Sequence, residues 1–293
     1  MKRPSDETVR QVRRVTGAGM AVNVALAAGK FAVGLGCSSQ ALVADAVHSL
    51  SDLVTDVAVI LGVRYWTAPA DEVHPYGHGK IEALVSLFIA GALALVAYGL
   101  GVGALRSLAH GAATAPGLPA FFLALVSVVS KEALFRWTRR VARRLRSTAL
   151  EANAWHHRSD AVSSVPVAVS VAVANFFPSL AWADAAGATL VSLFVLQAAW
   201  AIGKSSVLEL IDAEIGTTAM DVAALVQKLP NVRRVHKVRA RRYGGAFSVD
   251  LHVHVDPTLT VTQGHAIGHA VRDALLASDL NVADVVVHVE PAA

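Results

Sequence analysis

Long apolar runs fill the first two thirds of this chain and limit what it can fold into. A helix that crosses a bilayer needs about 20 mostly apolar residues, because each residue adds about 1.5 Å of rise. The six runs that meet this requirement are 15–36, 40–66, 81–107, 117–137, 148–176 and 182–208. We therefore predict an α-helical membrane protein with a domain of six transmembrane helices at residues 15–208.

Composition agrees with a membrane protein. The 293 residues are 54% hydrophobic and 16% charged, with a mean hydropathy of +0.50, whereas soluble domains carry about 25% charged residues. The formal net charge is +4, but two basic clusters, at 10–14 and 136–146, adjoin apolar runs and show no interleaved aromatic pattern for stacking bases. We therefore expect the lipid bilayer, and no nucleic acid, as a partner.

The basic residues also predict the orientation. Residues 1–14 are polar, lack the apolar core of a signal peptide and read as a cytoplasmic N-terminal segment. The connections at 64–80 and 136–146 are basic as well. The connections that contain no Lys or Arg are 36–40, 109–119 and 177–183. Because basic loops stay on the cytoplasmic side, we expect a multi-pass protein of the cell inner membrane with both termini in the cytoplasm.

Residues 209–293 have the mixed composition of a soluble domain. The clearest strand signal is the apolar alternation at 247–255. In order, the patterns predict a helix at 217–229, strands at 232–239 and 246–255, a helix at 260–277 and a strand at 282–289. This αββαβ order fits a three-stranded sheet with helices on one face, and the open face would invite a second copy.

Ionisable residues recur inside two of the apolar runs. The second run carries four on one helical face, at spacings of three, four and four: Asp45, His48, Asp52 and Asp56. The fifth run carries His156 and Asp160, again four apart. One intramembrane histidine is often only a hydrogen-bonded packing residue. Two matched HxxxD pairs are different, because each ionisable group at membrane depth costs a few kcal/mol unless a ligand offsets it.

The two HxxxD pairs predict a metal site. Two imidazoles and two carboxylates suit four-coordinate Zn²⁺, with bonds of about 2.0–2.2 Å. The single cysteine, Cys37, offers no Cys-based zinc site. Asp45 and Asp56 lie one turn beyond the second-run pair, where they either line the access route or cap the network. His157 points about 100° from its neighbour on an ideal helix, so we expect it off the site.

The motifs ADAVHSLSD, HPYGHGK and HHRSDAVSS, together with the histidine-bearing tail, resemble the cation diffusion facilitator family of metal/proton antiporters over nearly the whole chain. The resemblance implies a homodimer that is a transporter and no enzyme. It also implies a ferredoxin-like cytoplasmic domain that regulates transport by binding metal. The family's transport ligands fall on His48, Asp52, His156 and Asp160. Well-known bacterial zinc and cadmium members carry Asp where His48 stands, whereas zinc-selective animal members carry His, which favours zinc over cadmium here. Manganese is disfavoured, because family members that move it usually replace a histidine with carboxylate or amide oxygen ligands.

The same resemblance implies further residues. A loop metal site matches Asp71, His74 and His78, although the two histidines could be ordinary surface residues. Lys80 matches a residue that pairs with an Asp, here Asp212, and locks the subunits together. A cytoplasmic site matches a set that could also be exposed sheet positions: His236, His252, His265, His288 and Glu290. Glu290 stands where the family usually has Asp.

Histidine and carboxylate bind metal only when deprotonated, so proton entry can expel the ion, and protons are the expected counter-ion in an alternating-access exchange. Fe²⁺, Co²⁺ and Ni²⁺ accept the same ligands and stay open as alternatives to Zn²⁺. A membrane metalloenzyme is disfavoured because HxxxD lacks the Glu of HExxH. A nontransporting membrane metal sensor would leave the intramembrane ligand set without a purpose.

Overall fold

The computed structural model describes residues 6–111, 115–145, 148–213 and 217–292. Inside the helices, the side chains that lie outside this description are those of residues 6–9, 12, 13, 55, 56, 59, 60, 148, 149 and 152. The chain divides into two compact units. The first combines Met1–Val57 with Ile89–Trp200, and the second combines Ala58–Phe88 with Ala201–Ala293.

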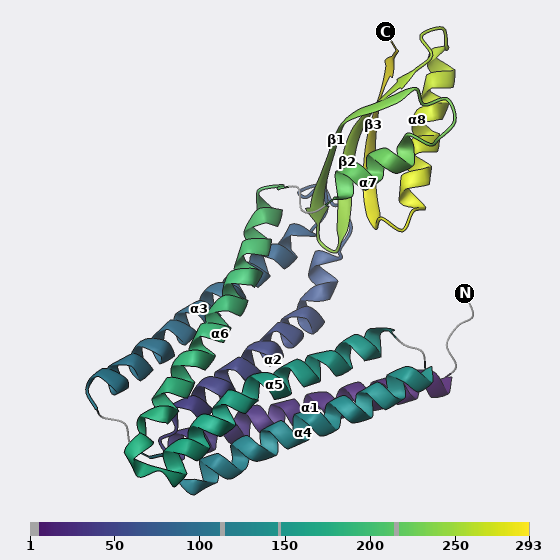
Figure 1. Cartoon of the computed structure of the whole chain (residues 1–293). Helices are drawn as coiled ribbons and strands as arrows, with labels where there is room; N and C mark the ends of the chain where they lie inside the picture. Colours follow the sequence, from purple (N-terminus) through teal and green to yellow (C-terminus); the bar gives the residue numbers. More distant parts are fainter. Residues whose placement is uncertain (1–5, 112–114, 146–147, 214–216, 293) are drawn as a thin grey trace. The chain divides into compact units, whose positions relative to one another are not determined.

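Every apolar run predicted to span the membrane is helical (Figure 1). The long helices are α1 (Asp6–Gly36), α2 (Gln40–Trp66), α3 (Lys80–Ala109), α4 (Leu118–Leu145), α5 (Thr148–Phe176) and α6 (Trp182–Leu210), with a short 3-10 turn, η1 (Pro178–Leu180), before the last. Among the described residues, five segments are long and apolar enough to cross a membrane: Arg14–Gly36, Lys80–Ala109, Leu118–Leu145, Asn153–Phe176 and Pro178–Leu210. Helix α2 has a similar length, 27 residues, but includes side chains outside the described set.

Two basic segments expected outside the spans are helical. Helix α1 begins at Asp6 rather than near residue 15, and α4 continues to Leu145 through the arginine run that was predicted as a loop. Arginine and alanine are strong helix formers, and neither glycine nor proline interrupts residues 120–145. The helices therefore extend past their apolar stretches, as propensity favours once the bundle has nucleated them.

Small side chains form the core of the first unit. Helix α4 packs against α5 and α1 (Figure 1), and the buried core consists mainly of alanine and valine: Ala41, Ala44, Ala97, Ala120, Ala124, Val167, Val171 and Val191. Small residues let transmembrane helices approach closely, which increases van der Waals contact where lipid gives no hydrophobic driving force. The tightest approach is at Gly187, where an added β-carbon would lie 2.6 Å from Ser170 Cβ and 3.2 Å from Ala41 Cβ.

The soluble part of the second unit confirms the predicted αββαβ order. Its elements are α7 (Thr218–Val226), β1 (Arg234–Tyr243), β2 (Ala246–Val255), α8 (Val261–Leu276) and β3 (Val282–Pro291). The sheet order is β1-β2-β3, with β1 antiparallel to β2 and β2 parallel to β3, so α8 is the crossover that a parallel pair requires. Both helices cover one face (Figure 1), and the core beneath them includes Val226, Val249, Leu251, Val271 and Leu275.

The close approach at Gly187 gives a first prediction. Gly187→Ala should destabilise the bundle by about 1–3 kcal/mol, because the added methyl group has no room against Ser170. Gly91→Ala is the matched control, since nothing lies within 4 Å of a β-carbon there, and alanine favours a helix over glycine by up to about 1 kcal/mol. Thermal unfolding in detergent should show a lower midpoint for the first variant only. An equal shift in both variants would contradict the packing described.

Candidate metal sites

Three groups of histidine and carboxylate side chains within the described residues are spaced to hold a metal ion. In each group the possible ligand atoms lie within 4.8 Å of one another. The groups are His48, Asp52 and Asp160; Asp71, His74 and His78; and His236, His252 and Glu290. Each one contains residues that the sequence singled out.

The first group joins α2 to α5 inside the first unit. His48 and Asp52 are half-buried on successive turns of α2, and Asp160 is buried on α5. His156, the fourth expected ligand, lies one turn before Asp160, with 3.9 Å between its Nδ1 and Asp160 Oδ1. Its side chain is 50% exposed. The structure thus brings three expected ligands together, with His156 at the rim of the group.

This arrangement brings two acidic side chains close together, one half-buried and one buried. Asp52 and Asp160 come from different helices, and their carboxylates lie within reach of one ion. Two carboxylates repel strongly in a medium of low dielectric constant, and a divalent cation between them removes that repulsion. The imidazole of His48 adds a neutral nitrogen ligand. The chemistry of the group is therefore that of a cation site.

Two buried lysines complete the charge pattern of the bundle, and sequence reasoning missed both. Lys30 on α1 is 0% exposed, and its Nζ lies 2.8 Å from Asp45 Oδ2. Lys131 on α4 is 1% exposed, and its Nζ lies 3.6 Å from Asp160 Oδ2. A lysine in the middle of an apolar run was the available signal, because ionisable residues at membrane depth are expensive and have partners.

The ion pair with Lys30 accounts for the position of Asp45. Lys30 Nζ also donates a hydrogen bond to Ser49 Oγ at 3.1 Å, and Ser164 Oγ on α5 donates one to Asp45 Oδ1 at 3.1 Å. Asp45 is therefore buried in a network that links α1, α2 and α5. The side chain of Asp56, its expected counterpart, lies outside the described residues. His157 is buried against Gly19 of α1, where a β-carbon would come within 3.0 Å of its Nε2.

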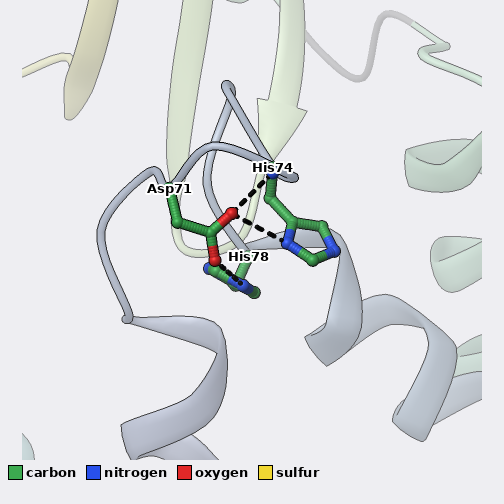
Figure 2. A group of neighbouring side chains, drawn as sticks. All are labelled: Asp71, His74 and His78. Atoms are coloured by element: carbon green, nitrogen blue, oxygen red, sulfur yellow. Dashed lines mark hydrogen bonds and ion pairs between the residues drawn. The ribbon is translucent and has the colours of Figure 1, made fainter.

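The second group lies in the connection between α2 and α3, within the second unit. Figure 2 shows Asp71 between the two imidazoles: its Oδ1 lies 3.1 Å from His74 Nδ1 and its Oδ2 lies 3.3 Å from His78 Nε2. The backbone N–H of His74 donates to the same Oδ1 at 2.6 Å and is the main reason that the pKa of Asp71 lies below its ordinary value. The carboxylate is thus held ionised and oriented toward both histidines.

The loop that carries this group has two fixed points. The hydroxyl oxygen of Tyr243, at the end of β1, accepts a hydrogen bond from the N–H of Gly79 at 2.7 Å. Gly77 has a φ of +85°, a conformation that other residues rarely adopt. Directly after the loop, Lys80 Nζ lies 2.9 Å from Asp212 Oδ1, so the structure contains the pair that the sequence suggested.

Strand register builds the third group. Across the sheet, His236 of β1 lies opposite His252 of β2, which lies opposite His288 of β3. Two residues further along both strands, His254 lies opposite Glu290. Strand side chains alternate with period two, so this whole set points away from the helices, while the alternate residues of β2 fill the core.

A β-bulge keeps His236 in this row. The register between β1 and β2 shifts between His236 and Arg239, and Lys237 inside the bulge has a φ of +49°. Without the extra residue, His236 and Arg239 would point to opposite faces because they are three apart. Bulges commonly re-aim side chains at functional sites, and this one aims an imidazole at the group.

Glu290 lies at the centre of the third group. Its Oε1 is 2.6 Å from His252 Nδ1 and 3.4 Å from His288 Nε2. Its Oε2 is 3.2 Å from His254 Nε2 and 3.3 Å from His236 Nε2. The hydrogen bond with His252 is the main cause of a lowered pKa for Glu290. Partial burial lowers the pKa of His236, which favours the neutral imidazole that a metal requires.

Within one chain, the structure adds His254 to this group and places His265 away from it. His254 had no assigned role, yet it contacts Glu290; its period-two spacing from His252 was the signal. His265 was expected in the cytoplasmic site, but within one chain it lies on α8, beside β3 residues of the helix-covered face. There its ring contacts that of His269, with 4.5 Å between centroids. The reason is topological, because α8 packs on the face opposite the histidine row.

Comparison with known proteins identifies the family. The family model described as the cation efflux transmembrane domain matches residues 18–211. The model described as the cation efflux protein, cytoplasmic domain, matches residues 216–292. The chain therefore belongs to the cation diffusion facilitator family of divalent metal cation efflux transporters, which are not enzymes.

Named relatives agree over most of the chain. Metal tolerance protein C1 of Arabidopsis thaliana is 32% identical over 94% of this chain, and the match spans 61% of that protein's length. Manganese efflux system protein MneP of Bacillus subtilis (strain 168) is 30% identical over 95% of this chain and 96% of its own length. Magnetosome protein MamM of Paramagnetospirillum magneticum is 32% identical over 90% of this chain and 83% of its own length.

Among solved structures, the MamM fragment titled "MamM-CTD 215-293" is 29% identical to this chain. It covers 26% of this chain and 96% of its own length, with a TM-score of 0.25.

The position of Glu290 gives a second prediction. Glu290→Ala should weaken zinc binding to the soluble domain at least tenfold, because it removes the one carboxylate that all four imidazoles share. The measurement is a zinc titration of full-length protein that also carries Asp52→Ala and Asp71→Ala, so that the other two groups are disabled. His269→Ala is the control, since that ring lies on the opposite face of the sheet. Equal losses in both variants would contradict the site.

Proposed function

We propose that this chain exports Zn²⁺ across the cell inner membrane in exchange for protons, by alternating access of the site formed by His48, Asp52, His156 and Asp160. The observation that carries the proposal is the meeting of His48, Asp52 and Asp160 from α2 and α5 in one group, with Asp160 buried and the other two half-buried. A site shared by two helices can open to either side when one helix shifts against the other. The fourth ligand, His156, would close around the ion by a small movement of the α5 turn that carries it.

Proton coupling follows from the ligand chemistry. Imidazole and carboxylate must lose their protons to bind metal, so loading releases protons and re-protonation expels the ion. An unperturbed histidine has a pKa of about 6.5 and can exchange protons over the pH range that membranes separate. His156 is the most exposed member of the set, at 50%, and is therefore the one that protons from outside the bundle reach most directly.

The soluble domain would act as the regulator. We place it in the cytoplasm with both termini and infer a homodimer, in which the open histidine face of one sheet faces its partner. Filling of the group around Glu290 would draw the two domains together. The pair between Lys80 and Asp212 would then help to hold the subunits in register.

Manganese efflux is a second candidate, favoured by one observation: the relative MneP, whose name gives manganese as its cargo, is 30% identical over 95% of this chain. Carboxylate and water oxygens suit Mn²⁺, whereas imidazole suits Zn²⁺, Fe²⁺, Co²⁺ and Ni²⁺ better. The histidines His48 and His156 therefore favour zinc. Competition among these ions for uptake into proteoliposomes separates the candidates, and stronger inhibition by Mn²⁺ than by its rivals would replace zinc as the cargo.

The transport site gives a third prediction. His156→Ala or Asp52→Ala protein in liposomes should lose at least nine tenths of its zinc-driven proton flux, an effect of roughly tenfold or more, because each variant lacks an expected ligand. His110→Ala serves as a matched control, because that exposed histidine at the end of α3 bonds only to the carbonyl of Arg106 among the described contacts. Wild-type flux in either ligand variant would overturn the assignment.

A further inference from the structure

The two buried lysines of the bundle, Lys30 and Lys131, differ in the contacts that their ammonium groups make. Lys30 Nζ has a short ion pair with Asp45 and a hydrogen bond to Ser49. Lys131 Nζ makes no hydrogen bond to any described residue. It nevertheless lies 3.6 Å from Asp160 Oδ2, and Lys131 is only 1% exposed.

The partner of Lys131 is a ligand of the transport site. Asp160 belongs to the group with His48 and Asp52, so the ammonium of Lys131 is a cation held against the same carboxylate that would bind the transported ion. An isolated buried ammonium is very costly, and a loose ion pair at this distance offsets only part of that cost. The loose geometry lets Lys131 move away without breaking a hydrogen bond to any described residue.

Resting on the proposed function, we propose that Lys131 is a tethered competitor of the transported metal. Its ammonium neutralises Asp160 while the site is empty and withdraws when a divalent cation binds. Metal and lysine thus share one carboxylate, and each weakens the hold of the other. Lys131 is a residue that sets affinity, in addition to the four expected ligands.

The device has two consequences for transport. The first is that the ammonium reduces the negative charge of the empty site during its return step. Two uncompensated carboxylates would slow that step in a medium of low dielectric constant. The second is that the lysine raises the dissociation constant of the metal, so that an otherwise tight four-ligand site can release its cargo. Helices α4 and α5 pack against each other, so Lys131 stays next to Asp160 when the pair moves as a unit.

The test measures zinc affinity and transport on the same full-length variants. Lys131→Met removes the ammonium and keeps the length of the side chain, and it should tighten the dissociation constant for Zn²⁺ about tenfold or more, which equals about 1.4 kcal/mol or more. Its maximal transport rate should fall, because release becomes slower. Lys131→Arg keeps the charge and should remain closer to wild type in affinity. A merely structural role for Lys131 would weaken binding or leave it unchanged.

An ion pair elsewhere on α4 supplies the matched control. The double variant Glu132→Gln, Arg136→Met removes the pair between Arg136 Nε and Glu132 Oε1 without changing the net charge, and its zinc affinity should stay within about twofold of wild type. Zinc affinity in Lys131→Met that is unchanged or weaker than wild type would overturn the inference. If Asp160→Ala protein binds zinc as well as wild type does, or if wild type binds none, then both the inference and the proposed function fail.

A structure of the wild-type protein with zinc provides a second measurement that needs no variant. Lys131 Nζ should lie clearly further from Asp160 Oδ2 than the 3.6 Å of the present structure. Zinc bound to Asp160 with the ammonium still beside the same oxygen would overturn the inference even if Lys131→Met protein does not fold.

Discussion

The placement of ionisable groups in a medium that cannot solvate them is the constraint on which the bundle depends. Lys30 and Asp45 form an ion pair at 2.8 Å, within a hydrogen-bonded network that links three helices. Asp160 has a looser partner, Lys131, at 3.6 Å. The tight pair contributes to how the helices are positioned, and the loose one leaves a carboxylate available to a metal. Under the proposed function, the tight pair is structural and the loose pair contains a metal ligand.

In the soluble domain, histidine and carboxylate side chains lie on the open face of a sheet instead of between helices. Its helices cover one face of a three-stranded sheet, and the alternation of β2 sends valine and leucine into that core and histidine to the open face. Parallel pairing with β3 then sets His288 and Glu290 beside the histidines of β2. Glu290 gathers four imidazoles, so a single carboxylate holds the candidate regulatory site together.

Much of this could be predicted from local patterns. Apolar runs gave six helices with boundaries close to those observed, since both ends of a span are marked by loss of hydrophobicity. The exceptions, α1 and α4, extend through basic residues because hydrophobicity marks the membrane and helix propensity continues beyond it. The HxxxD spacing placed His48 and Asp52 on one face, because residues four apart on a helix are always neighbours.

The sequence by itself determined the membrane class and the six long helices, because these depend on the length of the apolar runs. It also determined the candidate ligands of α2 and α5 and the strand that presents the histidines, because these depend on periods of 3.6 and 2 residues. Only the tertiary structure decided which charges meet. Lys131 reaches Asp160 from another helix, His254 joins Glu290 through strand register, and His265 lies on the far side of the sheet within one chain. Such pairings depend on how elements distant in sequence pack together, which no local spacing specifies.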